Sequence, residues 1–426
     1  MRAPCLLLAL TAASGLAQDA AAARATLEPC GRTVVLCAAE LPALRGLRPA
    51  QLWLCAARSG AVRAIPFQVD ERVPGGDYAW TEGDERKSDV DEGRLDDDDE
   101  LSFYARDAGD RLPPGELVLG QVAAQELELV DPAGGRAWAY LLAFPEGEPT
   151  PPGAPDDRAS LLFREGEVAG FRGARLQLLG TCDENLLHLA ELRLMGASGW
   201  GPDLLDRLKL HLRASYLFTG IERAQDEVRA GLRAWRDGPV RVVARLGVES
   251  YLIWGHWIRS VPGGARLVLW EDRLELAVAA RVPVDLETDA RSELRLSLDL
   301  APEVAGLKVW TDKNPDPLRP GERLPRALDR TAPGWIAIGA AGSTVLCRVR
   351  PGESLRGAGN ALYLRVDPSP DPPEDHPGAQ LDAGWTLDLT GLRAGVHSLE
   401  LELRAAPEDG VERLLRADTA LQVVVR

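Results

Sequence analysis

The sequence predicts a mainly β protein with two β-sandwich domains, of which the second is the larger, and with one short helix. Apolar and polar residues alternate with a period of two in many segments, as in residues 293–300, which is typical of strands with one buried face. A proline-rich segment, residues 146–158, divides the chain, because closely spaced prolines continue neither a sheet nor a helix. Sheets with one apolar face bury it against each other, and this favours sandwiches.

The first residues have the pattern of a secretory signal peptide. Met1-Arg2 is followed by an apolar stretch from Cys5 to Leu10 and by small residues up to Ala17. A positive start, a short apolar core and small residues at the end predict a signal peptide over residues 1–17, with Ala23 as an alternative cleavage position. No later apolar segment has the length of a transmembrane helix. We therefore expect a protein that is exported to the periplasm or the extracellular space.

Residues 24–145 are predicted to form the first sandwich. Short runs of β-branched, aromatic and aliphatic residues are separated there by Gly, Pro and Asp turns. The turn at residues 131–135, Asp-Pro-Ala-Gly-Gly, predicts a hairpin. The expected strands are residues 33–37, 51–54, 126–130 and 138–142.

Residues 159–426 are predicted to form the larger sandwich. The helix is expected at Ile221 to Trp235, where apolar residues have helical spacing and Gly238-Pro239 follows. A second proline-rich segment at residues 367–378 is either a sub-domain boundary or a long loop. The expected strands are residues 208–216, 266–270, 274–278, 293–300 and 398–403.

Net charge and cysteine content restrict the partners and the redox chemistry. A formal net charge of −16 disfavours nucleic acid and anionic membranes and favours cations or neutral polymers. Removal of the signal peptide leaves an odd number of cysteines, so at least one thiol is free or pairs with another chain. A bridge among the first three and buried free thiols are both open. The five are Cys30, Cys37, Cys55, Cys182 and Cys347.

The densest chemical signal is the acidic run between Asp89 and Glu100. Carboxylates at alternate positions, followed by glycine, an aliphatic residue and a further carboxylate, supply the oxygen ligands that calcium needs. The order resembles the calcium loops of EF-hands and dockerins, with one residue missing and no clear flanking helix. The alternative is a solvated acidic loop, which is the usual state of a charge run. The candidate metal ligands are Asp89, Asp91, Asp96, Asp99 and Glu100.

Aromatic residues provide a second candidate site. The chain has eleven Trp but only six Phe, and indole rings stack on the apolar faces of sugars. The alternative is that these side chains pack in the core, as most aromatic residues of sandwiches do. The candidate ligand-binding residues are Tyr251, Trp254, His256, Trp257 and Trp270.

Another polar segment, with Asp312, Lys313 and Asp316, is either a loop at a cleft or a surface turn. Asn-Pro and Asp-Pro steps within it favour the turn.

Two short motifs suggest a family resemblance. Gln68-Val69-Asp70 and Asp99-Glu100-Leu101-Ser102-Phe103 resemble a pattern of exported bacterial β-proteins, in which a strand ending in Gln-x-Asp precedes an Asp-Glu-Leu-x-Phe strand. The arrangement is also similar to that of secreted mutarotase-like super-sandwich proteins that act on sugars, and residues 237–243 extend the likeness. The resemblance implies a super-sandwich-like second domain and a carbohydrate ligand, and it transfers no catalytic residue.

These observations predict an exported, non-catalytic protein that binds a glycan or another component of the cell envelope, with calcium as a possible stabilising ion. One alternative is a secreted carbohydrate-active enzyme, a lyase or hydrolase. Another is a structural subunit of a cell-surface assembly, held together through exposed strand edges. The sequence has no nucleophile elbow, phosphate-binding loop or dinucleotide fingerprint, which favours binding over catalysis.

Overall fold

The computed structural model contains two compact units. The first comprises residues up to Gly76, Asp89–Pro155 and Thr419–Arg426, and the second comprises Asp77–Ser88 and Asp156–Asp418. The predicted signal peptide, Cys30, Asp91, Cys182 and His256 lie outside the described residues, as do the side chains of residues 250–262. The structure describes residues 23–27, 32–89, 93–113, 115–117, 120–148, 153, 158–164, 167–180, 185–216, 219–224, 227–254, 257–301, 304–340, 342–366, 369, 381–407, 410–417 and 421–426.

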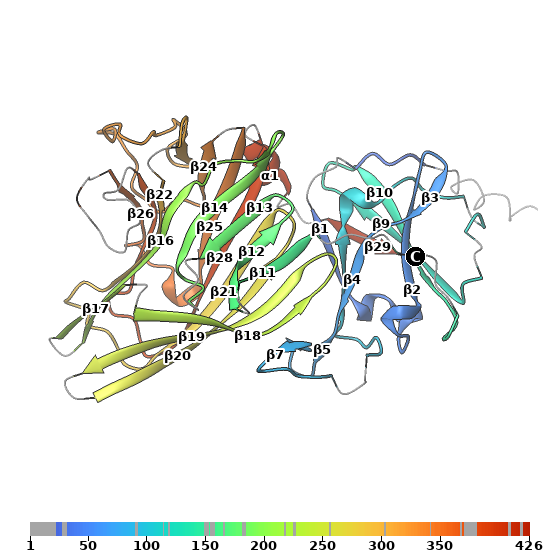
Figure 1. The fold of residues 1–426 in the computed structure, drawn as a ribbon, viewed down its shortest axis with the longest axis horizontal. Helices are drawn as coiled ribbons and strands as arrows, with labels where there is room; N and C mark the ends of the chain where they lie inside the picture. Colours follow the sequence, from blue (N-terminus) through green and yellow to red (C-terminus); the bar gives the residue numbers. More distant parts are fainter. Residues whose placement is uncertain are drawn as a thin grey trace, which may run out of the picture. The chain divides into compact units, whose positions relative to one another are not determined.

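Unit 1 is a sandwich of two antiparallel sheets (Figure 1). One sheet has the order β1-β8-β4 and the other β29-β9-β10-β2-β3. Alternating apolar residues of both sheets, such as Leu101 in β8 and Leu141 in β10, form one core. Its strands are β1 (Thr33–Cys37), β2 (Leu52–Arg58), β3 (Ala61–Ala64), β4 (Phe67–Asp70), β5 (Arg72–Val73), β8 (Glu100–Tyr104), β9 (Ala123–Val130), β10 (Arg136–Ala143) and β29 (Gln422–Val425).

The β9–β10 hairpin confirms the turn that the sequence predicts. The backbone N–H of Gly135 donates to the Asp131 carboxylate at 2.8 Å, and Gly134 has a φ of +87°, a conformation that glycine adopts at little cost. The hairpin is extended by β29, which pairs with β9 and is drawn in red beside it in Figure 1. Residues 422–425 thus form an edge strand of the five-stranded sheet of unit 1, although we expected residues 159–426 to stay together.

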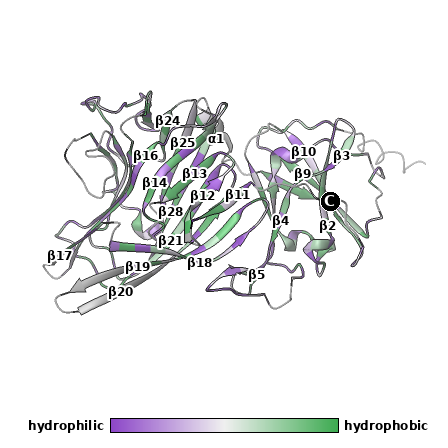
Figure 2. Cartoon of the chain, viewed as in Figure 1, coloured by the Kyte–Doolittle hydropathy of each residue, from purple (hydrophilic) through white to green (hydrophobic). Residues whose placement is uncertain are grey.

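Unit 2 is built from three sheets that share one large apolar core. Their orders are β11-β12-β13-β14-β15, β17-β16-β22-β27-β26, and β23-β24-β25-β28-β21-β20-β19-β18-β7. Leucines at every second position, such as Leu296 and Leu298, face this core. Hydrophilic and hydrophobic bands follow one another along strands such as β12 and β13 (Figure 2). The mainly β fold and the larger second sandwich are therefore confirmed.

The elements of unit 2 begin with β6 (Asp77–Tyr78) and β7 (Glu82–Gly83). They continue with β11 (Ala159–Arg164), β12 (Glu167–Gly173), β13 (Leu176–Gly180), β14 (Leu189–Gly196), β15 (Gly199–Trp200), β16 (Leu205–Tyr216), β17 (Thr219–Ala224), β18 (Val228–Asp237), β19 (Val242–Trp254), β20 (Trp257–Leu269), β21 (Arg273–Val282), β22 (Glu293–Leu300), β23 (Lys308–Thr311), β24 (Ile336–Ala340), β25 (Ser343–Pro351), β26 (Ala361–Arg365), β27 (Asp382–Asp388), β28 (Gly395–Pro407) and α1 (Val411–Ala417).

The predicted helix at Ile221 to Trp235 is wrong. The described residues of this segment belong to β17 and β18, and the pairing of β18 with β19 shifts register between Leu232 and Ala234. A bulge of this kind inserts a residue and interrupts the two-residue alternation. The apolar spacing therefore looked helical. The short α-helix of the described residues is instead α1. None of the helices described has the length and apolarity needed to cross a membrane.

The strands that flank the second proline-rich segment are neighbours. β26 and β27 pair antiparallel, from Ala361 opposite Thr386 to Arg365 opposite Asp382. Residues 367–378 thus connect two adjacent strands of one sheet.

Candidate functional sites

The acidic run lies in unit 1, between Ser88 and β8. Leu95 is buried, and its backbone bonds to Gly46 and Leu47 hold the loop against the sandwich. This anchor brings the carboxylates of Asp96, Asp98 and Asp99 together, with one oxygen from each within 4.8 Å of the others. Asp89 is only 8% exposed, and neither of its carboxylate oxygens has a hydrogen-bond partner. We call Asp96, Asp98 and Asp99 the acidic cluster.

Backbone donors fix part of this cluster. The Asp99 carboxylate accepts the N–H of Arg72 at 2.8 Å and the N–H of Asp96 at 3.0 Å. The Asp96 carboxylate accepts the N–H of Asp98 at 3.1 Å. The loop therefore curls so that its acidic side chains converge.

The electrostatics of the cluster are unfavourable. The side chain of Asp96 is the main cause of a raised pKa at Asp98, with burial and the charge of Asp89 adding to it. Burial raises the pKa of Asp99 to about 6. Within the described residues, no lysine or arginine forms an ion pair with any member of the cluster. Ionised carboxylates that lie this close repel one another, and this repulsion disfavours their charged form.

Two acidic neighbours are held differently. Glu100, a predicted ligand, pairs with Arg72. Asp97 pairs with Arg45, and both of these side chains are more than half exposed. Glu100 thus lies in an ion pair, whereas Asp98, which the predicted ligand set did not contain, lies beside Asp96 and Asp99.

Of the predicted aromatic platform, only the side chain of Trp270 lies in the described part of the structure, since those of residues 250–262 lie outside it. The backbones of Trp254 and Trp257 are cross-strand neighbours where β19 meets β20. Trp270 is 2% exposed, and the guanidinium groups of Arg241 and Arg273 lie 5.0 and 5.3 Å from its ring centre. Trp270 is therefore a core residue, since a ring this deeply buried offers no face to a sugar.

Unit 2 has an open pocket of about 490 Å³ elsewhere. Strands β18 and β19 contribute most of its lining, and Gly231 leaves open space above its own position. The lining residues are Gly83, Asp84, Phe163, Val168, Asn185, Leu186, Arg229, Gly231, Leu232, Arg233, Trp235, Gly247 and Glu249. We call it the unit-2 pocket; its volume is in the range of sites for small ligands.

The pocket combines aromatic rings with charged groups. The rings of Phe163 and Trp235 lie 5.9 Å apart at 47°, and Phe163 is 49% exposed. Arg233 lies over Gly247, where a side chain would collide with it, and pairs with Glu249 at 3.0 Å. Arg229 and Asp84 have no ion-pair or hydrogen-bond partner among the described residues.

Sequence reasoning missed the unit-2 pocket. Its residues come from β7 and the adjoining Asp84, from β11, β12, β18 and β19, and from the segment around Asn185. No single stretch of sequence carries the pattern, and only the register of β7 against β18, with Gly83 opposite Ala234, brings Asp84 to this place.

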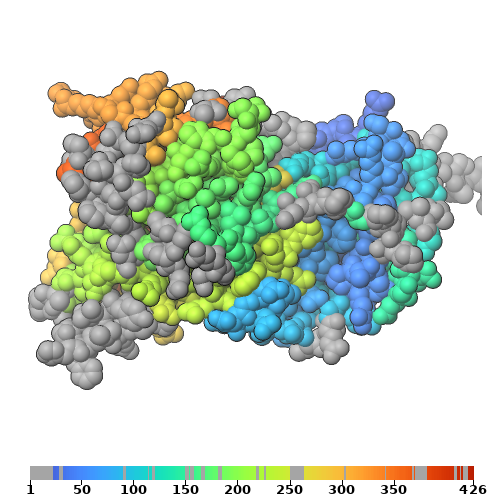
Figure 3. All heavy atoms as spheres, in the orientation of Figure 1, coloured from blue at the N-terminus to red at the C-terminus, as the bar shows by residue number. Residues whose placement is uncertain are grey.

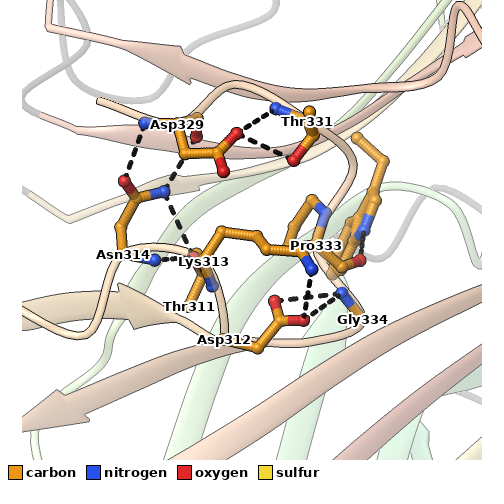
Figure 4. A network of polar contacts seen from close by, with 9 residues as sticks. Thr311, Asp312, Lys313, Asn314, Asp329, Thr331, Pro333 and Gly334 are labelled. Atoms are coloured by element: carbon orange, nitrogen blue, oxygen red, sulfur yellow. Dashed lines mark hydrogen bonds and ion pairs between the residues drawn. The ribbon is translucent and has the colours of Figure 1, made fainter. Parts of the chain in front are cut away.

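The segment around Asp312 forms a dense network of polar contacts between β23 and β24 (Figure 4). Asn314 donates to the carbonyl of Asp329 at 2.9 Å and accepts its N–H at 3.0 Å. The Asp312 carboxylate accepts the N–H of Gly334. We call residues 311–314 and 329–334 the polar loop; this region, orange in Figure 3, lies at the surface of unit 2. The surface-turn interpretation of Asp312 and Lys313 fits this geometry.

The described cysteines form no disulfide. Cys37 is exposed, whereas Cys55 and Cys347 are buried free thiols. Burial raises the pKa of the Cys55 thiol to about 12, so it has little thiolate character at neutral pH. A Cys37–Cys55 bridge is absent, and Cys30 lies outside the described residues.

Comparison with known proteins leaves the family open. No protein-family model matches the sequence, and no curated protein matches it. Among solved structures, an alpha-mannosidase from Enterococcus faecalis V583 matches with a TM-score of 0.46 and 9% identity over 95% of this chain and 46% of that one. A glycosyl hydrolase family 38 protein from Enterococcus faecalis matches with a TM-score of 0.46 and 10% identity, over 95% of this chain and 47% of that one.

A copper-containing benzylamine oxidase from Hansenula polymorpha matches with a TM-score of 0.26 and 9% identity, over 89% of this chain and 78% of that one. This chain spans less than half the length of the two Enterococcus proteins. Likeness at this level assigns no activity.

Proposed function

We propose that the chain is an exported glycan-binding protein, periplasmic or extracellular, whose ligand occupies the unit-2 pocket. The observation that supports this most is the combination of two groups of side chains in one pocket. Exposed Phe163 contacts half-buried Trp235, and the charged groups of Arg229 and Asp84 have no partner among the described residues. Aromatic faces pack on the C–H faces of sugar rings. Charged side chains form strong hydrogen bonds to neutral hydroxyl groups.

The charges of the pocket favour a neutral sugar. Arg233 and Glu249 neutralise each other at 3.0 Å, and Arg229 and Asp84 carry one charge of each sign. An anionic ligand would meet Asp84 and a cationic one Arg229, so each would leave one pocket charge repelled. The overall charge of −16 also disfavours acidic polymers. The ligand class we infer is therefore a neutral oligosaccharide or the neutral end of a glycan.

A retention assay on the full chain tests this. Immobilised neutral polysaccharides should retain the protein, and Arg229→Ala and Phe163→Ala should each weaken retention by about tenfold, because each loses about 1–2 kcal/mol of contact. Arg266→Ala is the matched control, since Arg266 is exposed on β20 and outside the pocket. Retention that is equal in all four proteins would contradict the pocket assignment.

The same assay separates binding from hydrolysis. Asp84 and Glu249 both line the pocket, and glycoside hydrolysis uses two carboxylates. Because Glu249 is engaged by Arg233, we expect retention without shortened products. Release of shortened oligosaccharides that is abolished by Asp84→Asn and by Glu249→Gln would support the enzyme alternative instead.

A further inference from the structure

A cavity of about 50 Å³ lies inside unit 2, and all three sheets of this unit contribute to its walls. Phe171 of β12, Leu208 of β16 and Leu246 of β19 are examples, one from each sheet. Among the described residues that line it, Cys347 has the one ionisable side chain. Burial raises the pKa of this thiol, so it stays neutral. We call this space the apolar cavity, and its lining suits an uncharged group without hydrogen-bonding atoms.

The apolar cavity is large for a protein interior. Native cores contain few voids larger than a water molecule, and this volume has room for about four groups of the size of a water or a methylene. Water gains little in such a space, because a buried water needs several polar partners. The cavity therefore either stays empty, which costs stability, or takes an apolar group from outside the chain.

The position of the apolar cavity favours the second alternative, because it adjoins the unit-2 pocket. Leu186 lines both spaces. Along β18, Ala230 lines the cavity and its neighbour Gly231 lines the pocket; along β19, the same is true of Leu246 and Gly247. One leucine side chain thus borders both an open pocket with charged groups and an inner space without them.

The backbone beside Leu186 is fixed by hydrogen bonds to β18. The side-chain amide of Asn185 donates to the carbonyl of Val228 at 2.8 Å, and its oxygen accepts the N–H of Ala230 at 2.9 Å. The N–H of Leu186 donates to the carbonyl of Ala230 at 2.9 Å. A leucine on a fixed backbone, with space on two sides, can change its rotamer without moving the strand. A ligand in the pocket is therefore one side-chain movement away from the cavity.

We propose that unit 2 binds a neutral sugar that carries an aliphatic chain, with the sugar in the unit-2 pocket and the chain in the apolar cavity. This inference rests on the proposed function and narrows its ligand from a neutral glycan to an acylated or alkylated one. The hydroxyl groups of the sugar suit Arg229 and Asp84 in the pocket, and the chain suits the apolar lining of the cavity. An acyl group on a polysaccharide and the first carbons of a glycolipid tail share this chemistry.

Titration calorimetry of the full chain with n-alkyl glycosides tests the proposal. The probes are glucosides, galactosides and mannosides with tails from methyl to octyl, used below the concentrations at which they form micelles. We expect the affinity to rise about fourfold for each added methylene up to a butyl tail, which the cavity can hold. The heat-capacity change of binding should become more negative over the same range. A rise that stops at butyl supports an acylated glycan as the source, and one that continues to octyl supports a glycolipid.

A variant that fills the cavity locates the chain. Ala230 is 1% exposed and lines the apolar cavity, and isoleucine fits a strand because it is β-branched. In the native chain the butyl glycoside should bind about 60-fold more tightly than the methyl glycoside. In Ala230→Ile this ratio should fall below about fivefold. Ala279→Ile is the matched control and should keep the native ratio, because Ala279 is exposed on β21 and lines neither space.

The series on the native chain decides the matter even where Ala230→Ile does not fold. Methyl and butyl glycosides that bind with equal affinity would overturn this inference and leave the pocket assignment intact. Absence of binding by every glycoside would overturn both. An equal ratio in Ala230→Ile and in the native chain would also overturn the inference, since the aliphatic chain would then lie outside the apolar cavity.

Discussion

The polar loop of unit 2 and the acidic cluster of unit 1 are both turns rich in aspartate, yet their carboxylates are in opposite states. In the polar loop, the Asp329 carboxylate accepts the N–H and the hydroxyl of Thr331 at 2.9 and 2.8 Å, and these bonds lower its pKa. In the acidic cluster, the side chain of Asp96 raises the pKa of Asp98. The direction of the pKa shift separates a satisfied turn from a crowded one.

The difference comes from the supply of donors. The polar loop interleaves its acidic residues with Thr, Asn and Gly, whose hydroxyl, amide and backbone N–H groups reach the carboxylates (Figure 4). The run from Asp96 to Glu100 consists of acidic residues alone, and the buried carboxylate of Asp89 has no hydrogen-bond partner either. A count of acidic residues therefore says little about a cation site, whereas a count of unmet carboxylate oxygens says more.

We expect the largest effect at a buried carboxylate that a proton, rather than a donor or a cation, can neutralise. Asp382 on β27 is fully buried, and its backbone pairs with that of Asp299, which forms an ion pair with Lys209 at 2.6 Å. Burial, followed by the charge of Asp299, raises the pKa of Asp382 to about 7. Protonation of Asp382 would then remove the cost of burying its negative charge.

The sign of the pH dependence follows. Below about pH 4 the Asp382 carboxyl is neutral in both states, and its contribution is fully present. Between about pH 4 and 7 the unfolded chain ionises first, so native stability falls, by up to about 4 kcal/mol. Urea unfolding should show that Asp382→Asn, which has no charge, loses this slope. Asp316→Asn, at an exposed turn residue, is the control and should keep the fall of stability between about pH 4 and 7. Loss of this pH dependence in Asp316→Asn would point to a general charge effect.

The second effect tests whether the polar loop depends on internal donors alone. Asn314→Ala removes the two bonds to the Asp329 backbone and the contact with the Thr311 hydroxyl at 3.3 Å. We expect a loss of about 2–3 kcal/mol in the free energy of unfolding of unit 2, equal with calcium and with chelator. Lys313→Ala, which removes only a 3.9 Å ion pair to Asp312, should cost less than about 0.5 kcal/mol. A calcium-dependent loss in Asn314→Ala would break the contrast between the two regions.

Much of the fold could be predicted from the sequence, because burial on one face of a strand imposes alternation. The leucines of β22, for example, occupy every second position and face the core. The bulge at Leu232 hid β18, since an extra residue shifts the phase. Asp98 was missed because the spacing of a known calcium loop was given more weight than convergence in space. Phe163, Arg229 and Asp84 could not be found, because strand register brings them together.

The smallest effect asks how the polar loop is attached to the core beneath it. The indole N–H of Trp385, a buried residue of β27, donates to the carbonyl of Pro333 at 3.0 Å. Trp385→Phe keeps most of the apolar volume and removes this donor, so unfolding should cost about 1 kcal/mol less than in the native chain. Trp335 lies two residues after Pro333 and is half-buried. Trp335→Phe should lower the free energy of unfolding by about half as much as Trp385→Phe.

A loss above about 3 kcal/mol in Trp385→Phe would mean that packing, not the hydrogen bond, dominates at this position. The polar loop would then depend on the apolar core as the loop of the acidic cluster depends on buried Leu95. The two regions would still differ in what satisfies their carboxylates. Anchoring by one apolar side chain would be common to both, and the supply of donors would remain the property that separates them.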